Sequence, residues 1–125
     1  MKKNNPLPSV VIEQFLGFLK QCQHDYQQNA SAVWAYDKRN QDYLHEIEFA
    51  DCYEDRCKAA TCIHGQRKDR RRKKDNMMMV EKIAKFATDK QNKPFLDRLN
   101  SLLISQKEQE DYLEGERHYN RRGEP

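Results

Sequence analysis

The spacing of apolar and polar positions predicts an all-α protein built from long helices. Near the N-terminus, apolar side chains recur at intervals of three and four residues, which places them on one face of a helix. This stripe consists of Val11, Phe15, Phe18, Leu19, Cys22 and Tyr26. We therefore expect these side chains to be buried together.

A first helical arm is predicted over 9–49, after a tail over 1–8. Ser9 is expected to cap its N-terminus, because a serine hydroxyl accepts a hydrogen bond from an unpaired backbone N–H group. The arm is either continuous or broken near 29–31. Its second half carries aromatic residues, of which Trp34 and Tyr36 are expected to be core or interface anchors. The alternative is that these rings form a platform on which a base stacks.

A second, basic helix is predicted over 54–88. Asp51 and Glu54 have the spacing of a capping box, so the helix is expected to start there. At about 1.5 Å per residue it is roughly 50 Å long, whereas a globule of this size has a radius of gyration of about 14 Å. Such a helix must project from the molecule or pair with another, and Gly65 is the point at which it could bend.

A third helix is predicted over 94–114, with Pro94 at its first position and an apolar side that begins at Phe95. Helical periodicity ends at Gly115. The remaining residues, 115–125, are expected to form a basic, non-helical tail that contains Arg and Tyr. The long helices are expected to lie antiparallel in a single domain over 1–125.

The bulk composition predicts a thin core. The 125 residues are 37% hydrophobic and 34% charged, with a mean hydropathy of −1.15. A chain with so little to bury and one overlong helix is expected to form a homo-oligomer. No run approaches the roughly 20 apolar residues of a membrane span, and the N-terminus does not have the pattern of a signal peptide, so we expect a cytosolic protein without a membrane partner.

The four cysteines are expected to be thiols in that compartment. Cys52, Cys57, Cys62 and His64 could in principle supply three sulfurs and a nitrogen to zinc. Structural zinc sites usually have ligand pairs two to four residues apart, whereas these cysteines are five apart. Small buried residues are the better interpretation, and no metal or other cofactor is expected.

A dense basic block occupies Arg67–Lys74, where seven of the eight residues are Lys or Arg. The whole chain has 23 basic and 20 acidic residues, so the block carries +6 and the remainder, with 16 basic and 19 acidic residues, carries −3. The basicity is therefore local. A solvated face is the simplest interpretation, but so dense a run of one sign usually has an anionic partner or a compensating acidic surface.

Catalytic patterns are not apparent, and we do not expect an enzyme. There is no Gly-rich phosphate loop, no Gly-x-Ser-x-Gly and no His-Glu-x-x-His. A binding constellation is present instead, because Arg117 and Arg121 flank Tyr119 in the tail. Planar Arg forks bind phosphate through paired hydrogen bonds and a tyrosine ring can stack on a base.

Five short segments carry a family resemblance. They are 41–48 (Gln-Asp-Tyr-Leu-His-Glu-Ile-Glu), 55–58 (Asp-Arg-Cys-Lys), 70–75 (Arg-Arg-Arg-Lys-Lys-Asp), 90–93 (Lys-Gln-Asn-Lys) and 117–122 (Arg-His-Tyr-Asn-Arg-Arg). Their order and spacing resemble the first-described anti-Thoeris proteins of phages of Gram-positive bacteria, which are sponges for the immune signal glycocyclic ADP-ribose.

The resemblance implies a mainly helical, non-enzymatic protein that acts in the cytoplasm of the infected bacterial host. It would bind a cyclic ADP-ribose-type nucleotide intact, take up cyclic oligonucleotides in some members, and assemble into dimers and possibly hexamers. The ligand contacts that it implies are Arg56, Asn92, Arg117 and Arg121, with Phe86 or Tyr119 as the stacking ring. The family pattern has a Pro where this chain has Arg121, so the last contact falls on Arg121 or Arg122.

Two other functions remain open from the sequence. The basic block could lie along the phosphates of a nucleic acid, which would make the protein a nucleic-acid-binding phage regulator. Alternatively, the chain is a structural phage component whose charges pair with its own acidic surface or with Asp and Glu residues of a neighbouring protomer.

Overall fold

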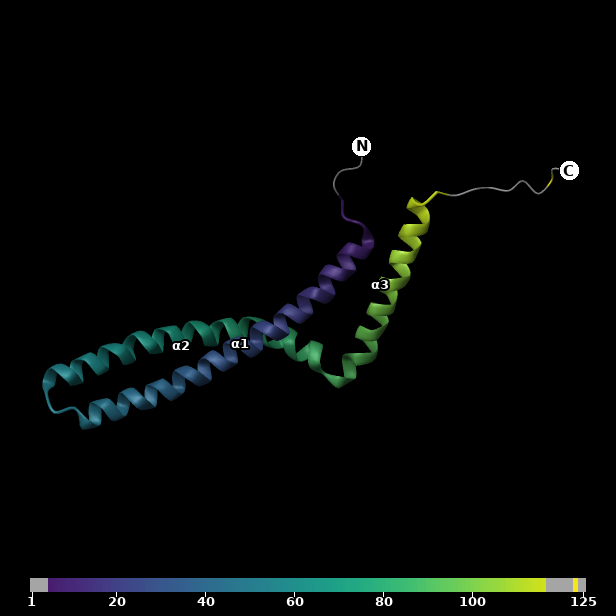
Figure 1. The fold of residues 1–125 in the computed structure, drawn as a ribbon. Coiled ribbons are helices and arrows are strands. Elements are labelled where there is room, and N and C mark those ends of the chain that lie inside the picture. The colour runs from purple at the N-terminus through teal and green to yellow at the C-terminus, as the bar shows by residue number, and fades with distance from the viewer. Residues whose placement is uncertain (1–4, 117–122, 124–125) are drawn as a thin grey trace. The chain divides into compact units, whose positions relative to one another are not determined.

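The structure, a computed structural model, describes residues 5–116 and 123, and this part of the chain is helical without strands. The elements are α1 (Pro8–Phe49), α2 (Tyr53–Thr88), the short 3-10 helix η1 (Lys90–Asn92) and α3 (Lys93–Glu114), in that order (Figure 1). The prediction of an all-α fold is confirmed. Helix α1 is continuous through 29–31, which decides between the two alternatives for that arm.

Both predicted N-caps are wrong. Helix α1 begins one residue before Ser9, and the carbonyl of Leu7 accepts the N–H groups of Val10 and Val11 at 2.9 and 3.3 Å. Ser9 instead bonds to a residue far along the chain. Helix α2 has Cys52 at its N-cap, in extended conformation and without a side-chain cap hydrogen bond, so Asp51 and Glu54 form no capping box.

The chain divides into two compact units, a hairpin unit (19–89) and a terminal unit (1–18 with 90–125). In the hairpin unit, the second part of α1 and helix α2 run antiparallel, joined by a short turn (Figure 1). Two contacts connect them directly: Gln66 Nε2 donates to the carbonyl of Tyr36 at 2.9 Å, and Arg70 Nε donates to Asp37 Oδ1 at 2.6 Å. The antiparallel arrangement of these two helices is therefore an intrachain pairing.

The residues between the two helices follow the seven-residue repeat of a coiled coil, in which intervals of three and four alternate. On α1, the buried and half-buried residues include Leu19, Cys22, Tyr26, Asn29, Val33, Tyr36, Asn40, Tyr43 and Ile47. On α2 they include Ala59, Ile63, Gln66, Arg70, Lys73, Met77, Val80, Ala84 and Ala87. These two rows, which we call the seam, give the hairpin its register.

The middle of the seam is polar and its ends are apolar. Gln66, Arg70 and Lys73 occupy three successive inward positions of α2, while small buried residues, Ala59 and Ala84, stand towards its ends. Polar residues at seam positions reduce stability but restrict the register, because a slipped alignment would leave them without their partners.

The terminal unit brings the start of α1 against α3 in antiparallel orientation. The side-chain hydroxyl of Ser9 donates to Glu110 Oε1, and its backbone N–H donates to Glu110 Oε2 at 2.9 Å. One turn further along α1, Glu13 Oε2 lies 3.4 Å from Lys107 Nζ, one turn back along α3. Glu110 therefore satisfies the first-turn N–H group of Ser9 itself, through a partner 101 residues away rather than through a local cap.

The predicted stripe of α1 is only partly buried. Leu19 and Cys22 are buried, but Val11, Phe15 and Phe18 are 51%, 44% and 50% exposed. The start of α1 is apolar on several faces, and the face that turns inward instead carries buried Ser9 and Leu16. The spacing of the apolar residues therefore predicted the helix correctly here, but it did not predict which face of the helix is buried.

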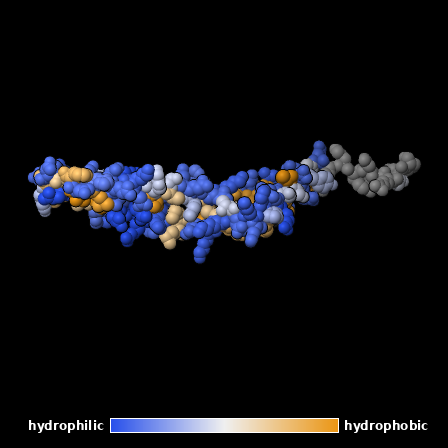
Figure 2. All heavy atoms as spheres, turned by 90° about the horizontal axis from the view of Figure 1, so that it is seen from below, coloured by the Kyte–Doolittle hydropathy of each residue, from blue (hydrophilic) through white to orange (hydrophobic). Residues whose placement is uncertain are grey.

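The thin core is confirmed for the described residues, where no side chain is fully buried and the buried apolar residues are Leu16, Leu19, Cys22, Ala59 and Ala84. The face shown in Figure 2 is mostly hydrophilic with scattered apolar patches. Trp34 is 61% exposed, so of its two predicted roles, core or interface anchor, the core role is wrong within one protomer. Among the described helices, none is long and apolar enough to cross a membrane.

The four cysteines are free thiols. Cys22 is buried, and this burial, together with Asp25, raises the pKa of its thiol. Cys52, Cys57 and Cys62 are exposed, so the prediction that they are small buried residues is wrong. They lie at the start of α2, and intervals of five residues rotate them away from a common face.

Candidate anion-binding site

The basic block lies wholly within α2, at the middle of the seam, and supplies two of the seam positions there. Gln66, just before it, is buried, and Arg70 and Lys73 are half-buried at seam positions. At about 100° per residue, Arg67, Lys68 and Arg71 lie within one quadrant or so of the helix surface, away from the seam centre. All three residues are exposed.

Two members of the block have carboxylate partners within the chain. Arg70 pairs with Asp37 at 2.6 Å, and Arg72 Nη2 pairs with Asp69 Oδ1 at 2.8 Å. The sequence-based alternative of pairing with a neighbouring protomer is thus not needed for Arg70, whose carboxylate comes from α1 of the same chain. The described residues provide no ion pair to the other five cations of the block, which are Arg67, Lys68, Arg71, Lys73 and Lys74.

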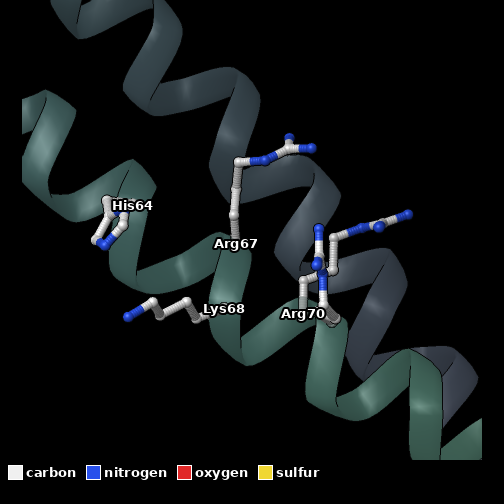
Figure 3. Close-up of a pocket in the computed structure, with 5 residues that line it drawn as sticks. His64, Arg67, Lys68 and Arg70 are labelled. Atoms are coloured by element: carbon white, nitrogen blue, oxygen red, sulfur yellow. The ribbon is translucent and has the colours of Figure 1, made fainter.

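An open concavity of about 520 Å³ lies on this part of α2 (Figure 3). Its lining residues are His64, Arg67, Lys68, Arg70 and Arg71. In Figure 3, Arg67 and Arg70 extend to the side of α2 on which α1 runs, whereas Lys68 extends to the other side. With four cations and no carboxylate in its lining, this concavity, which we call the basic groove, is suited to an anion.

Helix α1 has two cations at the same height along the hairpin as the basic block. This height is set by Asp37 of α1, which contacts Arg70 of α2. The two cations, Lys38 and Arg39, directly follow Asp37 in the sequence. Lys38 Nζ lies 4.2 Å from the centre of the Trp34 ring, and the Arg39 guanidinium lies 4.8 Å from that of Tyr36. Each ring thus has a cation over one face, which leaves the stacking-platform alternative only the other face of each ring.

The structure places three of the residues implied by the resemblance, and it keeps two of them far apart. Arg56 is exposed in the first turn of α2, and Phe86, 39% exposed, is in its last turn. Thirty residues of α-helix separate them by about 45 Å. Asn92 is half-buried at the N-cap position of α3. Arg56 and Phe86 of one protomer therefore cannot contact the same small ligand.

The first two segments of the resemblance do meet. Glu46 of 41–48 lines an open concavity of about 440 Å³ together with Asp55 and Lys58 of 55–58. Arg56 belongs to the same turn of α2 as these two residues. The arrangement follows from the hairpin, because the turn at 50–52 brings the end of α1 beside the start of α2.

The remaining residues of the predicted site lie outside the part of the chain that the structure describes. They are Arg117, Tyr119, Arg121 and Arg122. Within the described part, no group of three or more His, Cys, Asp or Glu side chains is arranged to hold a metal ion.

Sequence reasoning missed the charged residues that α1 places at the level of the basic block. Asp37, Lys38 and Arg39 form a short charged run directly after Tyr36, and this run was the available signal. What the sequence could not supply was the pairing register that sets Asp37 opposite Arg70. No family model matches the chain, and neither curated proteins nor solved structures give a match.

Proposed function

We propose that this chain is a homo-oligomeric phage protein that binds a cyclic ADP-ribose-type nucleotide, glycocyclic ADP-ribose in the first instance, and sequesters it without degradation in the cytoplasm of the infected host. The proposal starts from the five ordered segments of the resemblance. The observation that carries it furthest is that 41–48 and 55–58 adjoin one concavity, with Arg56 in the same turn of α2 as its lining residues Asp55 and Lys58. Residues that are separate in the sequence but share a function are expected to adjoin in this way.

The length of α2 bears on how such a site is built. Since Arg56 and Phe86 are about 45 Å apart along one helix, a nucleotide that touches both must lie between copies of the chain. In a two-fold dimer, Arg56 of one copy would face Phe86 of the other, and two equivalent sites would form. Oligomerisation is then a requirement of binding rather than an accessory to it.

The chemistry of the proposed contacts fits a dinucleotide-like ligand. Three or four charge-assisted hydrogen bonds from Arg56, Arg117 and Arg121 to a diphosphate are worth about 1.5 to 3 kcal/mol each. Together with a base stacked on Phe86 or Tyr119, these contacts approach the roughly 12 kcal/mol of nanomolar binding. Asn92 offers an amide that can recognise a hydroxyl or base edge.

Calorimetric titration of glycocyclic ADP-ribose into the protein tests the proposed contacts. We expect the double variant R117A/R121A to lose at least about a hundredfold in affinity, because two charge-assisted contacts are removed. The matched control K20A/R98A removes two exposed cations that lie outside the five segments, and it should bind like the wild type. Equal binding by R117A/R121A and the control would refute the assignment of these arginines.

Subunit mixing tests whether the site is shared between copies. R56A and F86A should each bind at least about tenfold more weakly than the wild type, because each lacks one contact of the site. If the two variants are unfolded and refolded together into dimers, about a quarter of the sites regain both wild-type residues, because half of the dimers are mixed and one of their two sites is intact. Absence of any recovered binding in verified mixed dimers would refute a site that combines Arg56 and Phe86 from different copies.

A further inference from the structure

The basic block is larger than one small nucleotide requires, and the proposed nucleotide contacts do not use it. Of its seven cations, only Arg70 and Arg72 have a carboxylate within ion-pair distance among the described residues. Like charges three and four residues apart repel each other on a helix, and Arg71 has Arg67, Lys68 and Lys74 at these spacings. An arrangement with such internal repulsion is relieved by an external polyanion.

The composition of the block narrows the class of polyanion. None of the twelve residues over 65–76 has an apolar side chain. Protein interfaces are organised around apolar or aromatic anchors, and amphipathic helices bind membranes through an apolar face. The inward face of α2 is directed at α1 across the seam. A partner that needs neither an anchor nor an apolar face is a nucleic-acid backbone.

The geometry favours a duplex over a single strand. Proteins that bind single strands use aromatic rings on which successive bases stack. The basic groove has no Phe, Tyr or Trp in its lining, and the nearby rings of Trp34 and Tyr36 each have a cation over one face. Arg forks and Lys ammonium groups along one helix contact successive phosphates instead, and duplex DNA offers one negative charge per roughly 1.7 Å of its axis.

We infer that the basic groove and the exposed cations beside it form a second binding surface, separate from the nucleotide site, for the phosphodiester backbone of duplex nucleic acid. Its central contacts are Arg67, Lys68 and Arg71. Arg70 has a different role, because its ion pair with Asp37 fixes the register of the two helices and so sets Lys38 and Arg39 of α1 at the level of the block.

The test is a fluorescence-anisotropy titration of labelled 20-base-pair duplexes of mixed sequence, about two turns of B-DNA, across a salt series. With three or four phosphate contacts, the log–log slope of affinity against salt is about −2.7 to −3.6, so a fourfold increase in salt weakens binding about 40- to 150-fold. The titration is run with both DNA and RNA duplexes, and the one that binds more tightly shows which kind of nucleic acid the surface prefers. Single strands of the same length should bind more weakly than the duplex.

A pair of matched variants separates the groove from the overall charge. K68Q/R71Q should make the slope less negative by about 2, since each removed phosphate contact changes it by about 1. K20Q/R98Q changes the net charge equally at exposed positions outside the block and should leave the slope unchanged. R117A/R121A should retain duplex binding, which distinguishes this surface from the nucleotide site.

Helicity by circular dichroism accompanies each titration. If K68Q/R71Q loses helicity, the single variants K68Q and R71Q replace it, each with an expected slope change of about 1. The inference is overturned by absence of duplex binding at low salt, by a preference for single strands, or by equal losses in the groove and control variants.

Discussion

Arg70 donates from Nε to Asp37 Oδ1 at 2.6 Å, and this contact joins the basic block to the other helix of the hairpin. The two residues are 33 positions apart in sequence. Arg70 occupies a seam position that an apolar residue would normally fill, and its side chain is 29% exposed while that of Asp37 is 54% exposed. The pair therefore contributes to the choice of register more than to the total stability of the hairpin.

Removing the carboxylate should weaken the hairpin slightly. D37N leaves the Arg70 guanidinium half-buried without its carboxylate, and we expect a loss of about 0.5 to 1 kcal/mol in the free energy of unfolding, as for a part-exposed ion pair. Urea denaturation followed by circular dichroism measures the change. R70L places an apolar side chain at the seam and should be neutral or stabilising, so a larger loss in R70L than in D37N would contradict this assignment of roles.

Removal of one cation from the basic block should stabilise the hairpin at low salt, because the like charges of the block repel each other. Because Arg71 has three cations and one acid at helical spacings of three and four, we expect R71Q to raise the free energy of unfolding by about 0.5 kcal/mol at low salt. The gain should disappear when the Debye length falls from about 30 Å at 0.01 M salt to about 3 Å at 1 M. K20Q is the control, since Lys20 has no like-charged residue at these spacings. A destabilised R71Q would show that Arg71 makes a favourable contact within the protein.

The contact between Ser9 and Glu110 makes the terminal unit sensitive to acid. The side-chain hydrogen bond from Ser9 is the main cause that lowers the pKa of Glu110, with further lowering by the Ser9 N–H group and Gln106, while burial acts in the opposite direction. A carboxyl whose pKa is lower in the folded state stabilises the fold above its ordinary pKa. This stabilisation is lost as the pH falls through the lowered value.

NMR titration of the Glu110 side-chain carbon measures this effect. In S9A the pKa should move up towards the ordinary value for glutamate, while remaining below it because the backbone N–H of residue 9 still donates. The acid unfolding transition should shift to higher pH in the same variant. K107A removes only a smaller electrostatic contribution and should shift the pKa of Glu110 less. Equal pKa values in S9A and the wild type would contradict the hydrogen-bond explanation.

The exposed apolar face of α1 in the terminal unit is the expected region of self-association. Val11, Phe15 and Phe18 are spaced along one face and are 44–51% exposed. F15D should weaken self-association by roughly ten- to a hundredfold, because burying one such side chain contributes about 1.5 to 3 kcal/mol. Sedimentation equilibrium measures the change. I104D, at a position 62% exposed on α3 and outside the five segments, is the control, and an unchanged assembly in F15D would exclude this face.

The extent of the helices could be predicted from the sequence because helix formation depends on local spacing. The intervals of three and four residues, the turn before Tyr53 and Pro94 near the start of α3 are all local signals. Which face of α1 is covered could not be predicted, since its first turns are apolar on several sides. Ser9 shows the same limit, because its partner Glu110 is 101 residues away.

The candidate site shows where sequence reasoning ends. The density of charge in Arg67–Lys74 was evident, but the selection of Arg70 for the seam depends on a register that charge counting does not contain. The contacts implied by the resemblance, Arg56 and Phe86, looked like one set in the sequence. The structure separates them along α2, because a continuous helix keeps residues 30 positions apart at a fixed distance.

The most direct test of sequestration measures the fate of the nucleotide. Purified protein in excess is incubated with glycocyclic ADP-ribose, the free nucleotide is measured after filtration, and the sample is then heated to unfold the protein and measured again. We predict depletion of the free nucleotide followed by full recovery of the intact molecule on heating. Absence of depletion, or recovery of a degraded product, would contradict the proposed sequestration.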